Sequence, residues 1–203
     1  MNTGKELDLT VIAPMYNEEA GLKRNLGRLL QELRKRNDRW ELIIVNDGSR
    51  DDSYRIAAEF ERDEPRLKVL SYKPNRGRGY ALRQGFKIAR GKYIVTTESD
   101  LSWGAIIVEK LYDALVETGA DMVIASPYLK GGRLENIPFK RAFLSRFGNK
   151  WLTFAVPGRL SMVSGMTRGY KREVIDSLEL EADRKEIHLE IVLQNHRRFG
   201  LPV

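Results

Sequence analysis

The sequence contains no cysteine and only two histidines among its 203 residues. Without cysteine the chain can form no disulfide and no thiolate metal site. A zinc site is also disfavoured, because zinc in proteins is held mostly by cysteine and histidine. Any metal ion would therefore rest mainly on oxygen ligands such as carboxylates, hydroxyls and phosphates, which favours Mg²⁺ or Mn²⁺.

Long apolar runs are absent as well. No stretch approaches the roughly 20 residues that a membrane-spanning helix needs, and the N-terminal sequence MNTGKELDL lacks the basic and apolar regions of a signal peptide. The expected location is therefore the cytoplasm, peripheral at the cytoplasmic face of a membrane if a lipid is involved. The chain is 42% hydrophobic and 31% charged, which is typical of a folded domain.

The net charge of +7 is unevenly distributed. Residues 133–172 hold nine basic residues and one acidic residue, whereas residues 173–203 are net acidic. A local basic surface predicts an anionic partner, which can be a phosphate group, anionic lipid or nucleic acid. Nucleic acid is the least favoured of these, because no recognisable nucleic-acid-binding module accompanies the charge.

Apolar runs alternate with amphipathic stretches through the first 126 residues. Buried strands are predicted over Leu9–Pro14, Glu41–Val45, Leu67–Ser71, Tyr93–Glu98 and Asp121–Ser126. Helical spacing follows each of the first four strands, and a further helix is predicted over Lys185–Phe199. This order predicts an α/β fold with a mostly parallel central sheet flanked by helices, and a ligand site outside the carboxyl ends of the strands.

The strongest chemical signal is Glu98-Ser99-Asp100, at the end of the fourth predicted strand. In an extended chain, alternation would place both carboxylates on the same side. Neighbouring carboxylates repel each other unless a cation lies between them or one is protonated. A divalent ion that also bridges a diphosphate would resolve this repulsion. The alternative interpretation is a solvated acidic loop.

Two other loops suit a nucleotide. Asp47 lies in the turn VNDGS, where its carboxylate can accept hydrogen bonds from a base or ribose, or can simply form a turn that leads into the next helix. Residues Asn75–Gly79 combine flexible backbone with two arginines ahead of a helix. That arrangement suits phosphate binding, and it suits a solvated surface turn equally well.

Taken in order, four segments resemble the pattern of family-2 glycosyltransferases, and most closely that of the polyprenyl-phosphate glycosyltransferases. They are PMYNEE (Pro14–Glu19), VNDGS (Val45–Ser49), NRGRGYAL (Asn75–Leu82) and ESDLS (Glu98–Ser102). The resemblance covers about residues 8–199 and is strongest over 8–126. It implies a single catalytic domain over residues 1–203 with the Rossmann-like GT-A fold, a UDP- or GDP-hexose donor, and a divalent metal ion.

The resemblance also implies roles for individual residues. Donor-binding residues would be Pro14, Tyr16, Glu18, Asp47, Arg78, Glu98 and Ser99, with Asp47 at the base or ribose. The metal ligands would be Glu98, Asp100 and Ser102. Asp100 is the firmer ligand, because Glu98 stands where the family has an aspartate and its longer side chain would reach the ion through water.

Two residues of the second half complete the expected site. The segment SGMTRGYKR (Ser164–Arg172) resembles a family segment in which an arginine binds phosphate, which implies this role for Arg168. Glu190 matches a late acidic position of the family and would act as the general base if the acceptor were a hydroxyl. Otherwise Glu190 is a polar residue on a half-buried helix. Asp100, Arg168 and Glu190 are therefore the expected catalytic residues.

A basic aromatic segment lies over residues 133–158. Its rings recur every three or four residues, at Phe139, Phe143, Phe147, Trp151 and Phe154, with lysines and arginines between them. Such a helix suits an anionic membrane surface, where rings enter the headgroup boundary and cations meet lipid phosphates. The alternative is a helix that packs its rings against the domain core.

The sequence therefore predicts an inverting glycosyltransferase that moves a hexose to a polyprenyl phosphate, either dolichyl or undecaprenyl. One alternative is transfer to a hydroxyl of a soluble glycan or protein. Another is a nucleotide-binding module without catalysis, to which the replacement of the usual aspartate by Glu98 is the only pointer.

Overall fold

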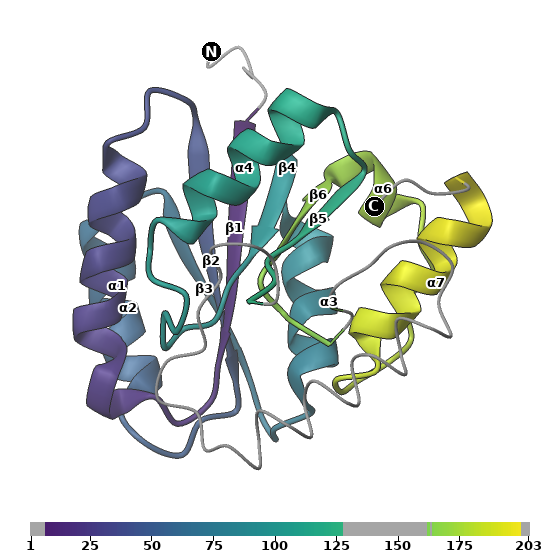
Figure 1. Ribbon diagram of the computed structural model, residues 1–203. Helices are drawn as coiled ribbons and strands as arrows, with labels where there is room; N and C mark the ends of the chain where they lie inside the picture. The colour runs from purple at the N-terminus through teal and green to yellow at the C-terminus, as the bar shows by residue number, and fades with distance from the viewer. Residues whose placement is uncertain (1–6, 128–161, 163, 200–203) are drawn as a thin grey trace, which may run out of the picture.

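The computed structural model describes residues 7–127, 162 and 164–199, so the helix predicted over 133–158 lies outside the described residues. Strands and helices alternate through the first half of the chain, as the sequence predicts (Figure 1). The described elements are β1 (Leu7–Met15), α1 (Glu19–Arg34), β2 (Trp40–Asp47), α2 (Ser53–Asp63), β3 (Leu67–Tyr72), α3 (Arg78–Ile88), β4 (Gly91–Thr96), α4 (Ile107–Thr118), β5 (Met122–Ile124), β6 (Arg168–Lys171), α6 (Arg172–Asp176) and α7 (Ile187–Phe199).

The strands form one sheet in the order β3-β2-β1-β4-β6-β5. Strands β1 to β4 pair in parallel, which brings their carboxyl ends to one edge of the sheet. Strand β6 runs antiparallel between β4 and β5, so Arg168 lies opposite both Thr96 and Ile124. The sheet is therefore mostly parallel, as predicted. The antiparallel position of β6 between β4 and β5 was not predicted.

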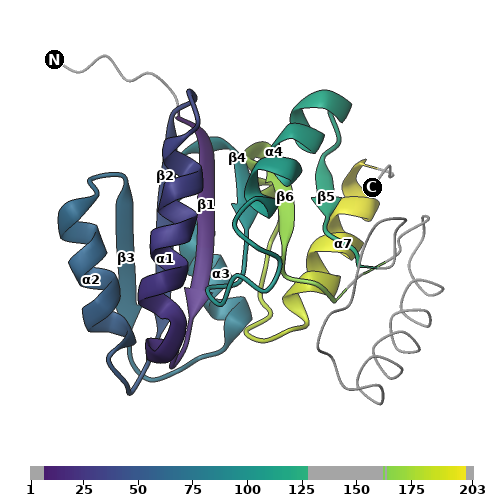
Figure 2. The same cartoon turned by 60° about the vertical axis from the view of Figure 1, so that its left-hand side comes forward.

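Helices cover both faces of the sheet (Figure 2). On one face Leu9, Val11 and Ala13 of β1 pack with α1, α2 and α4. On the other face Ile12 packs with α3, α6 and α7. Because both faces are covered, β1 reads as a continuous apolar run rather than an alternating one. Within the described residues, no helix is both long and apolar enough to cross a bilayer.

The fourth strand ends earlier than predicted. Strand β4 stops at Thr96, and the chain then turns, with the N–H of Leu101 donating to the carbonyl of Glu98 at 3.1 Å. Leu101 takes a left-handed φ of 51°. The prediction that Glu98 and Asp100 share one side of an extended chain is therefore wrong, because both lie in a turn beyond the strand.

Glu64, just past α2, makes acid stability testable. Its buried carboxylate accepts hydrogen bonds from Arg66 at 2.7 Å and from Arg34 at 3.0 Å. The bond from Arg66 is the main cause that lowers the pKa of Glu64 from 4.5 to about 2, and the bond from Arg34 adds to it against the effect of burial. Because the pKa is lower in the folded chain, ionised Glu64 stabilises the fold above pH 4.5, and this contribution is lost as the pH falls toward 2.

We expect Glu64→Gln to lower the free energy of unfolding at pH 7 by on the order of 2 kcal/mol, a figure reduced by the exposure of both arginines. At about pH 2.5 the loss should be clearly smaller, because Glu64 is then almost fully protonated in the unfolded chain and partly protonated in the folded chain, where its pKa is about 2. Urea unfolding at the two pH values measures the difference. Glu117→Gln, at an exposed position on α4, is the matched control. An equal loss at both pH values would contradict the ion-pair explanation.

Candidate active site

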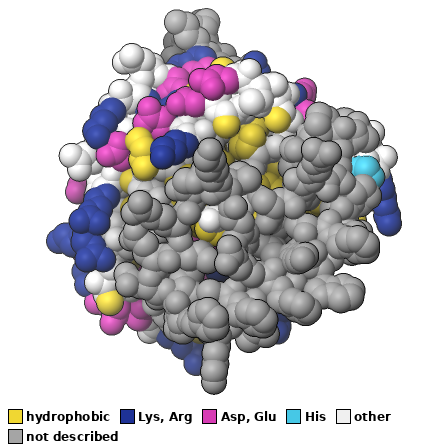
Figure 3. Space-filling view, viewed as in Figure 1, with side chains coloured by type: hydrophobic (Ala, Val, Ile, Leu, Met, Phe, Trp, Pro, Cys, Tyr) yellow, Lys and Arg dark blue, Asp and Glu magenta, His cyan; other side chains and the backbone are white. Residues whose placement is uncertain are grey.

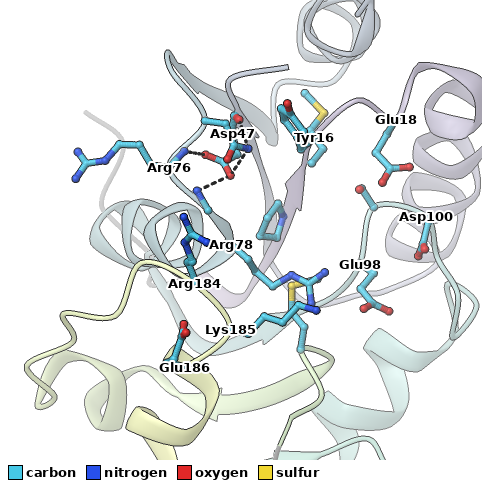
Figure 4. A pocket seen from close by; sticks show the side chains of 16 residues that line it. Tyr16, Glu18, Asp47, Arg76, Arg78, Glu98, Asp100, Arg184, Lys185 and Glu186 are labelled. Carbon is cyan, nitrogen blue, oxygen red and sulfur yellow. Dashed lines mark hydrogen bonds between the residues drawn. The ribbon is translucent and has the colours of Figure 1, made fainter. Parts of the chain in front are cut away.

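A cavity of about 690 Å³ opens at the carboxyl ends of β1, β2 and β4 (Figure 4). Its walls come from the ends of these strands, the start of α3, and residues 177–186 between α6 and α7, hereafter the 177–186 loop. The sequence-predicted residues that line the cavity are Pro14, Tyr16, Glu18, Asp47, Arg78, Glu98, Ser99 and Asp100. The parallel topology thus gathers segments that are far apart in the sequence, as expected for such a sheet.

The loops after β1 and β2 hold each other in place. The N–H of Asn17 donates to the hydroxyl of Ser49 at 3.0 Å, and the N–H of Glu18 donates to the hydroxyl of Ser53 at 2.7 Å. In return, the side-chain oxygen of Asn17 accepts from the N–H of Arg50 at 2.9 Å. These bonds fix the backbone that presents Tyr16 and Glu18 to the cavity.

Three carboxylates, those of Glu18, Glu98 and Asp100, stand on one side of the cavity and are called the acidic wall here (Figure 4). Burial raises the pKa of Glu18, and the charges of Asp100, Asp51 and Glu98 raise it further. Ser102 orients two members of the wall. Its hydroxyl donates to Glu98 at 2.5 Å, and its N–H donates to Asp100 at 2.9 Å.

The acidic wall fits a divalent cation through the chemistry of its donors. Its ligand atoms are carboxylate oxygens, which Mg²⁺ and Mn²⁺ prefer. Burial and the neighbouring carboxylates Asp100, Asp51 and Glu98 raise the pKa of Glu18, and a cation would offset the repulsion among these carboxylates. No group of three acidic or histidine side chains converges closely enough within the described ranges to hold a metal alone. An ion here would therefore complete its shell with ligand phosphates and water.

Asp47 lines the cavity but is heavily engaged by the protein. Its carboxylate accepts hydrogen bonds from the N–H groups of Arg76 at 2.8 Å and Gly77 at 2.9 Å, and from the side chain of Asn75 at 2.8 Å. Gly48 is required beside it, because its φ is 70° and an added Cβ would lie 2.6 Å from the backbone nitrogen of Asn75. The backbone donors that the sequence offered to phosphate are thus directed at Asp47 instead.

Opposite the acidic wall lie Arg78, at the start of α3, and the adjacent pair Arg184 and Lys185, in the 177–186 loop (Figure 4). These three are called the basic wall. The sequence predicted Arg78 but missed the pair, which sits in a net acidic stretch and looks like an ordinary charged helix start. The usable signal was the spacing of Gly77 and Gly79, since glycine often marks the close approach of another backbone.

The 177–186 loop is docked tightly on the start of α3. The carbonyl of Asp183 accepts from the N–H of Tyr80 at 3.0 Å, and the carboxylate of Asp183 pairs with Arg83. A Cβ added at Gly79 would lie 2.4 Å from the carbonyl oxygen of Ala182. Two segments about a hundred residues apart in sequence are therefore locked into one wall.

Comparison with known proteins decides the family. Over residues 10–179 the sequence matches the family described as Glycosyl transferase family 2. The chain belongs to this family. The family resemblance of the four motif segments is thereby confirmed.

The curated relatives of this family-2 chain include two polyprenyl-linked enzymes. It is 30% identical over 191 residues to a dolichol-phosphate mannosyltransferase of Pyrococcus furiosus, covering 93% of this chain and 53% of that protein. It is 31% identical over 176 residues to a polyprenol monophosphomannose synthase of Mycolicibacterium smegmatis, covering 85% of this chain and 64% of that protein. The chain therefore spans between half and two thirds of the length of these relatives.

A solved structure confirms the GT-A fold of the family-2 chain. The glucosyl-3-phosphoglycerate synthase of Mycobacterium tuberculosis, crystallised with Mn²⁺, uridine diphosphate and glucosyl-3-phosphoglycerate, matches with a TM-score of 0.69. The match covers 96% of this chain and 67% of that one at 21% identity. At this identity the likeness concerns the fold alone.

Arg168 is not where the sequence placed it. Its side chain is fully buried in β6, where it donates to the carbonyl of Gly165 at 2.6 Å and to that of His188 at 3.0 Å. Burial lowers the pKa of the Arg168 guanidinium. Arg168 is not among the described residues that line the cavity, so the geometry does not bring it to a donor phosphate as predicted. The antiparallel position of β6 turns this side chain into the core.

Glu190 likewise lies apart from the described lining of the cavity. Its carboxylate accepts hydrogen bonds from the N–H groups of Glu181 at 2.9 Å and Ala182 at 3.1 Å. It therefore holds the 177–186 loop from the side of α7, and the structure does not place it as a base. The carboxylate of that loop that does line the cavity is Glu186, which sequence reasoning missed.

Proposed function

We propose that this chain is the catalytic domain of a metal-dependent, inverting glycosyltransferase that moves a hexose from a nucleotide sugar to a polyprenyl phosphate. The observation that carries the proposal is one cavity, at the carboxyl ends of parallel strands, with an acidic wall facing a basic wall. A cation and a diphosphate between the walls would offset the charges of both. The polyprenyl-linked activities of the two curated relatives support the choice of acceptor.

The residues divide the work as follows. Asp100 and Glu98, which Ser102 orients, would hold the divalent ion, and Glu18 adds negative charge beside them. When bound, this ion neutralises charge on the departing diphosphate. Arg78 faces the same leaving group from the basic wall, where fixed positive charge stabilises the charge that develops in the transition state.

Transfer of the sugar to a phosphate acceptor needs no general base from the protein. A phosphate oxygen of the acceptor attacks the anomeric carbon from the face opposite the leaving group. The bond between that carbon and the donor's β-phosphate oxygen breaks, and the nucleoside diphosphate leaves with the electron pair. A phosphate monoester loses its second proton at a pKa of about 6, so the acceptor is mostly dianionic near neutral pH and no residue must remove a proton.

The test begins with thermal shift and ends with transfer. The chain is heated with Mn²⁺ and each nucleoside diphosphate in turn. A ligand at about a hundred times its Kd stabilises by about 2.7 kcal/mol, which raises the Tm of a chain of this size by roughly 5–10 °C. The chain is then incubated with geranyl phosphate and a nucleotide sugar that carries the most stabilising nucleoside diphosphate. Mass spectrometry detects the prenyl phosphosugar. The proposal would be overturned if no nucleoside diphosphate stabilised the chain and no product formed.

Glu186 favours one second candidate, transfer to a hydroxyl of a soluble acceptor. A hydroxyl must lose a proton during attack, and Glu186 is a carboxylate in the 177–186 loop that lines the cavity. If Glu186→Gln abolishes turnover while nucleotide binding persists, the hydroxyl acceptor is supported. If the variant keeps most of its activity with a prenyl phosphate, the first proposal stands.

We further propose peripheral association with an anionic membrane surface. Figure 3 shows acidic side chains gathered along α4, where Glu109, Asp113 and Glu117 are exposed at four-residue spacing. Anionic lipid would be repelled there, so a membrane would meet the chain on another side. The segment 133–158, which holds much of the basic excess, is the proposed contact.

A further inference from the structure

The basic wall gathers three cationic side chains on one side of the cavity. Within the described ranges, Arg78, Arg184 and Lys185 make no ion pair and no side-chain hydrogen bond. Glu186 is the one carboxylate of the 177–186 loop that lines the cavity beside them. With Glu186 counted against the three cations, the wall still keeps a net positive charge.

These cations are held in place rather than free to relax apart. The backbone of the 177–186 loop is fixed by Tyr80, by the ion pair between Asp183 and Arg83, and by the carboxylate of Glu190. Side chains mounted on a fixed backbone lose less conformational freedom when they bind an anion. The wall is thus preorganised for a negatively charged ligand.

The buried His188 lies close enough to the basic wall for the charges of Arg78 and Lys185 to add to the lowering of its pKa by burial. His188 is 1% exposed, and neither of its ring nitrogens has a hydrogen-bond partner. Burial, followed by the charges of Arg168, Arg78 and Lys185, lowers the pKa of His188 to about 2. The imidazole is therefore uncharged at neutral pH, so it adds no further positive charge to the wall.

The two walls can serve two different phosphates. A divalent ion on the acidic wall would engage the diphosphate of the donor, and Arg78 faces that ion across the cavity (Figure 4). Arg184 and Lys185 come from the other segment of the wall, the 177–186 loop. Both line the cavity, one with a planar guanidinium fork and the other with a compact ammonium, and each of these groups suits the oxygens of a terminal phosphate.

We infer that Arg184 and Lys185 bind the phosphate of the acceptor and select phosphomonoesters over alcohols. This inference rests on the proposed function, because it assigns that acceptor its binding residues. The pair would place the attacking phosphate oxygen near the anomeric carbon, so it acts by binding and positioning substrate rather than by proton transfer.

The experiment is a calorimetric titration of the chain, loaded with Mn²⁺ and the stabilising nucleoside diphosphate, with geranyl phosphate. Arg184→Gln combined with Lys185→Gln should weaken geranyl phosphate binding at least about tenfold, because both charge-assisted contacts are lost. The Kd of the nucleoside diphosphate with Mn²⁺ should change less than about twofold, which also shows that the variant is folded. Arg184→Lys with Lys185→Arg should restore most of the binding.

The matched control is Arg197→Gln with Arg198→Gln, an adjacent exposed pair near the end of α7 that does not line the described cavity. It should leave geranyl phosphate affinity unchanged. Three results would overturn the inference. They are equal binding of geraniol, a loss of nucleotide affinity with geranyl phosphate affinity intact, and inorganic phosphate binding as tightly as geranyl phosphate, which would make the pair a site for free phosphate.

The two proposals fail in different ways. If geranyl phosphate binds through the pair but receives no sugar, the proposed function fails while the binding assignment stands. If sugar is transferred to geranyl phosphate and the double variant keeps the same KM for it, the proposed function stands and the assignment is overturned.

Discussion

Asp100→Asn is expected to lower kcat/KM for sugar transfer at least about a thousandfold, which corresponds to about 4 kcal/mol of transition-state stabilisation. Removing the charge of the firmer metal ligand deprives the leaving diphosphate of its counter-charge. The asparagine oxygen can still accept the hydrogen bond that the N–H of Ser102 donates to Asp100 at 2.9 Å, so the turn should persist. The stabilisation of the chain by nucleoside diphosphate with Mn²⁺ should also disappear.

Two comparisons sharpen this test. Ser102→Ala should lower activity about 10–100-fold, because Ser102, predicted from sequence as a metal ligand, does not line the described cavity and instead orients Glu98 through its hydroxyl. Glu117→Gln removes one carboxylate from the exposed face of α4 and should change neither activity nor nucleotide binding. Retention of more than a tenth of the activity in Asp100→Asn would remove Asp100 from the metal site.

Gly79→Ala is expected to damage both stability and activity. The new Cβ would lie 2.4 Å from the carbonyl oxygen of Ala182 and 2.6 Å from that of Arg184. Backbone atoms cannot rotate away, so the 177–186 loop must shift. We expect the free energy of unfolding to fall by about 1–3 kcal/mol. We expect transfer to fall about a hundredfold, because a displacement on the order of 1 Å misplaces Arg184 and Lys185.

Gly27→Ala is the matched control for this substitution. Gly27 lies within α1 with no heavy atom within 4 Å of an added Cβ, so alanine should raise the free energy of unfolding by about 0.5–1 kcal/mol through its better helix propensity. Urea unfolding and steady-state transfer measure both variants. The same response from both glycines would show that docking of the 177–186 loop does not matter.

The acidic half of the site was predictable from sequence, because its residues follow directly after apolar strands. A parallel sheet brings the ends of β1, β2 and β4 to one edge, so Glu18, Asp47 and Asp100 had to meet. The local geometry of these loops was not predicted correctly. The chain turns at Leu101 instead of staying extended, and Asp47 accepts hydrogen bonds from its own neighbouring loop.

The basic half depends on a long-range pairing, to which only the spacing of Gly77 and Gly79 points. Arg184 and Lys185 reach the cavity only because the backbone of Asp183 docks on Tyr80 and Gly79, about a hundred residues earlier. Arg168 was misplaced for a related reason. Its strand β6 enters the sheet antiparallel between β4 and β5, and a four-residue strand carries too little periodicity to show which face its side chains take.

The antiparallel pairing of β5 with β6 brings the two ends of their connection together. Ile124 lies opposite Arg168, and the N–H of Ala125 donates to the carbonyl of Thr167 at 3.0 Å, so the stretch between them leaves and rejoins the sheet at one point. Loop-closure entropy grows only with the logarithm of length, and doubling such an excursion costs roughly 0.6 kcal/mol. The length of the connection between β5 and β6 is therefore only weakly constrained by the stability of the sheet.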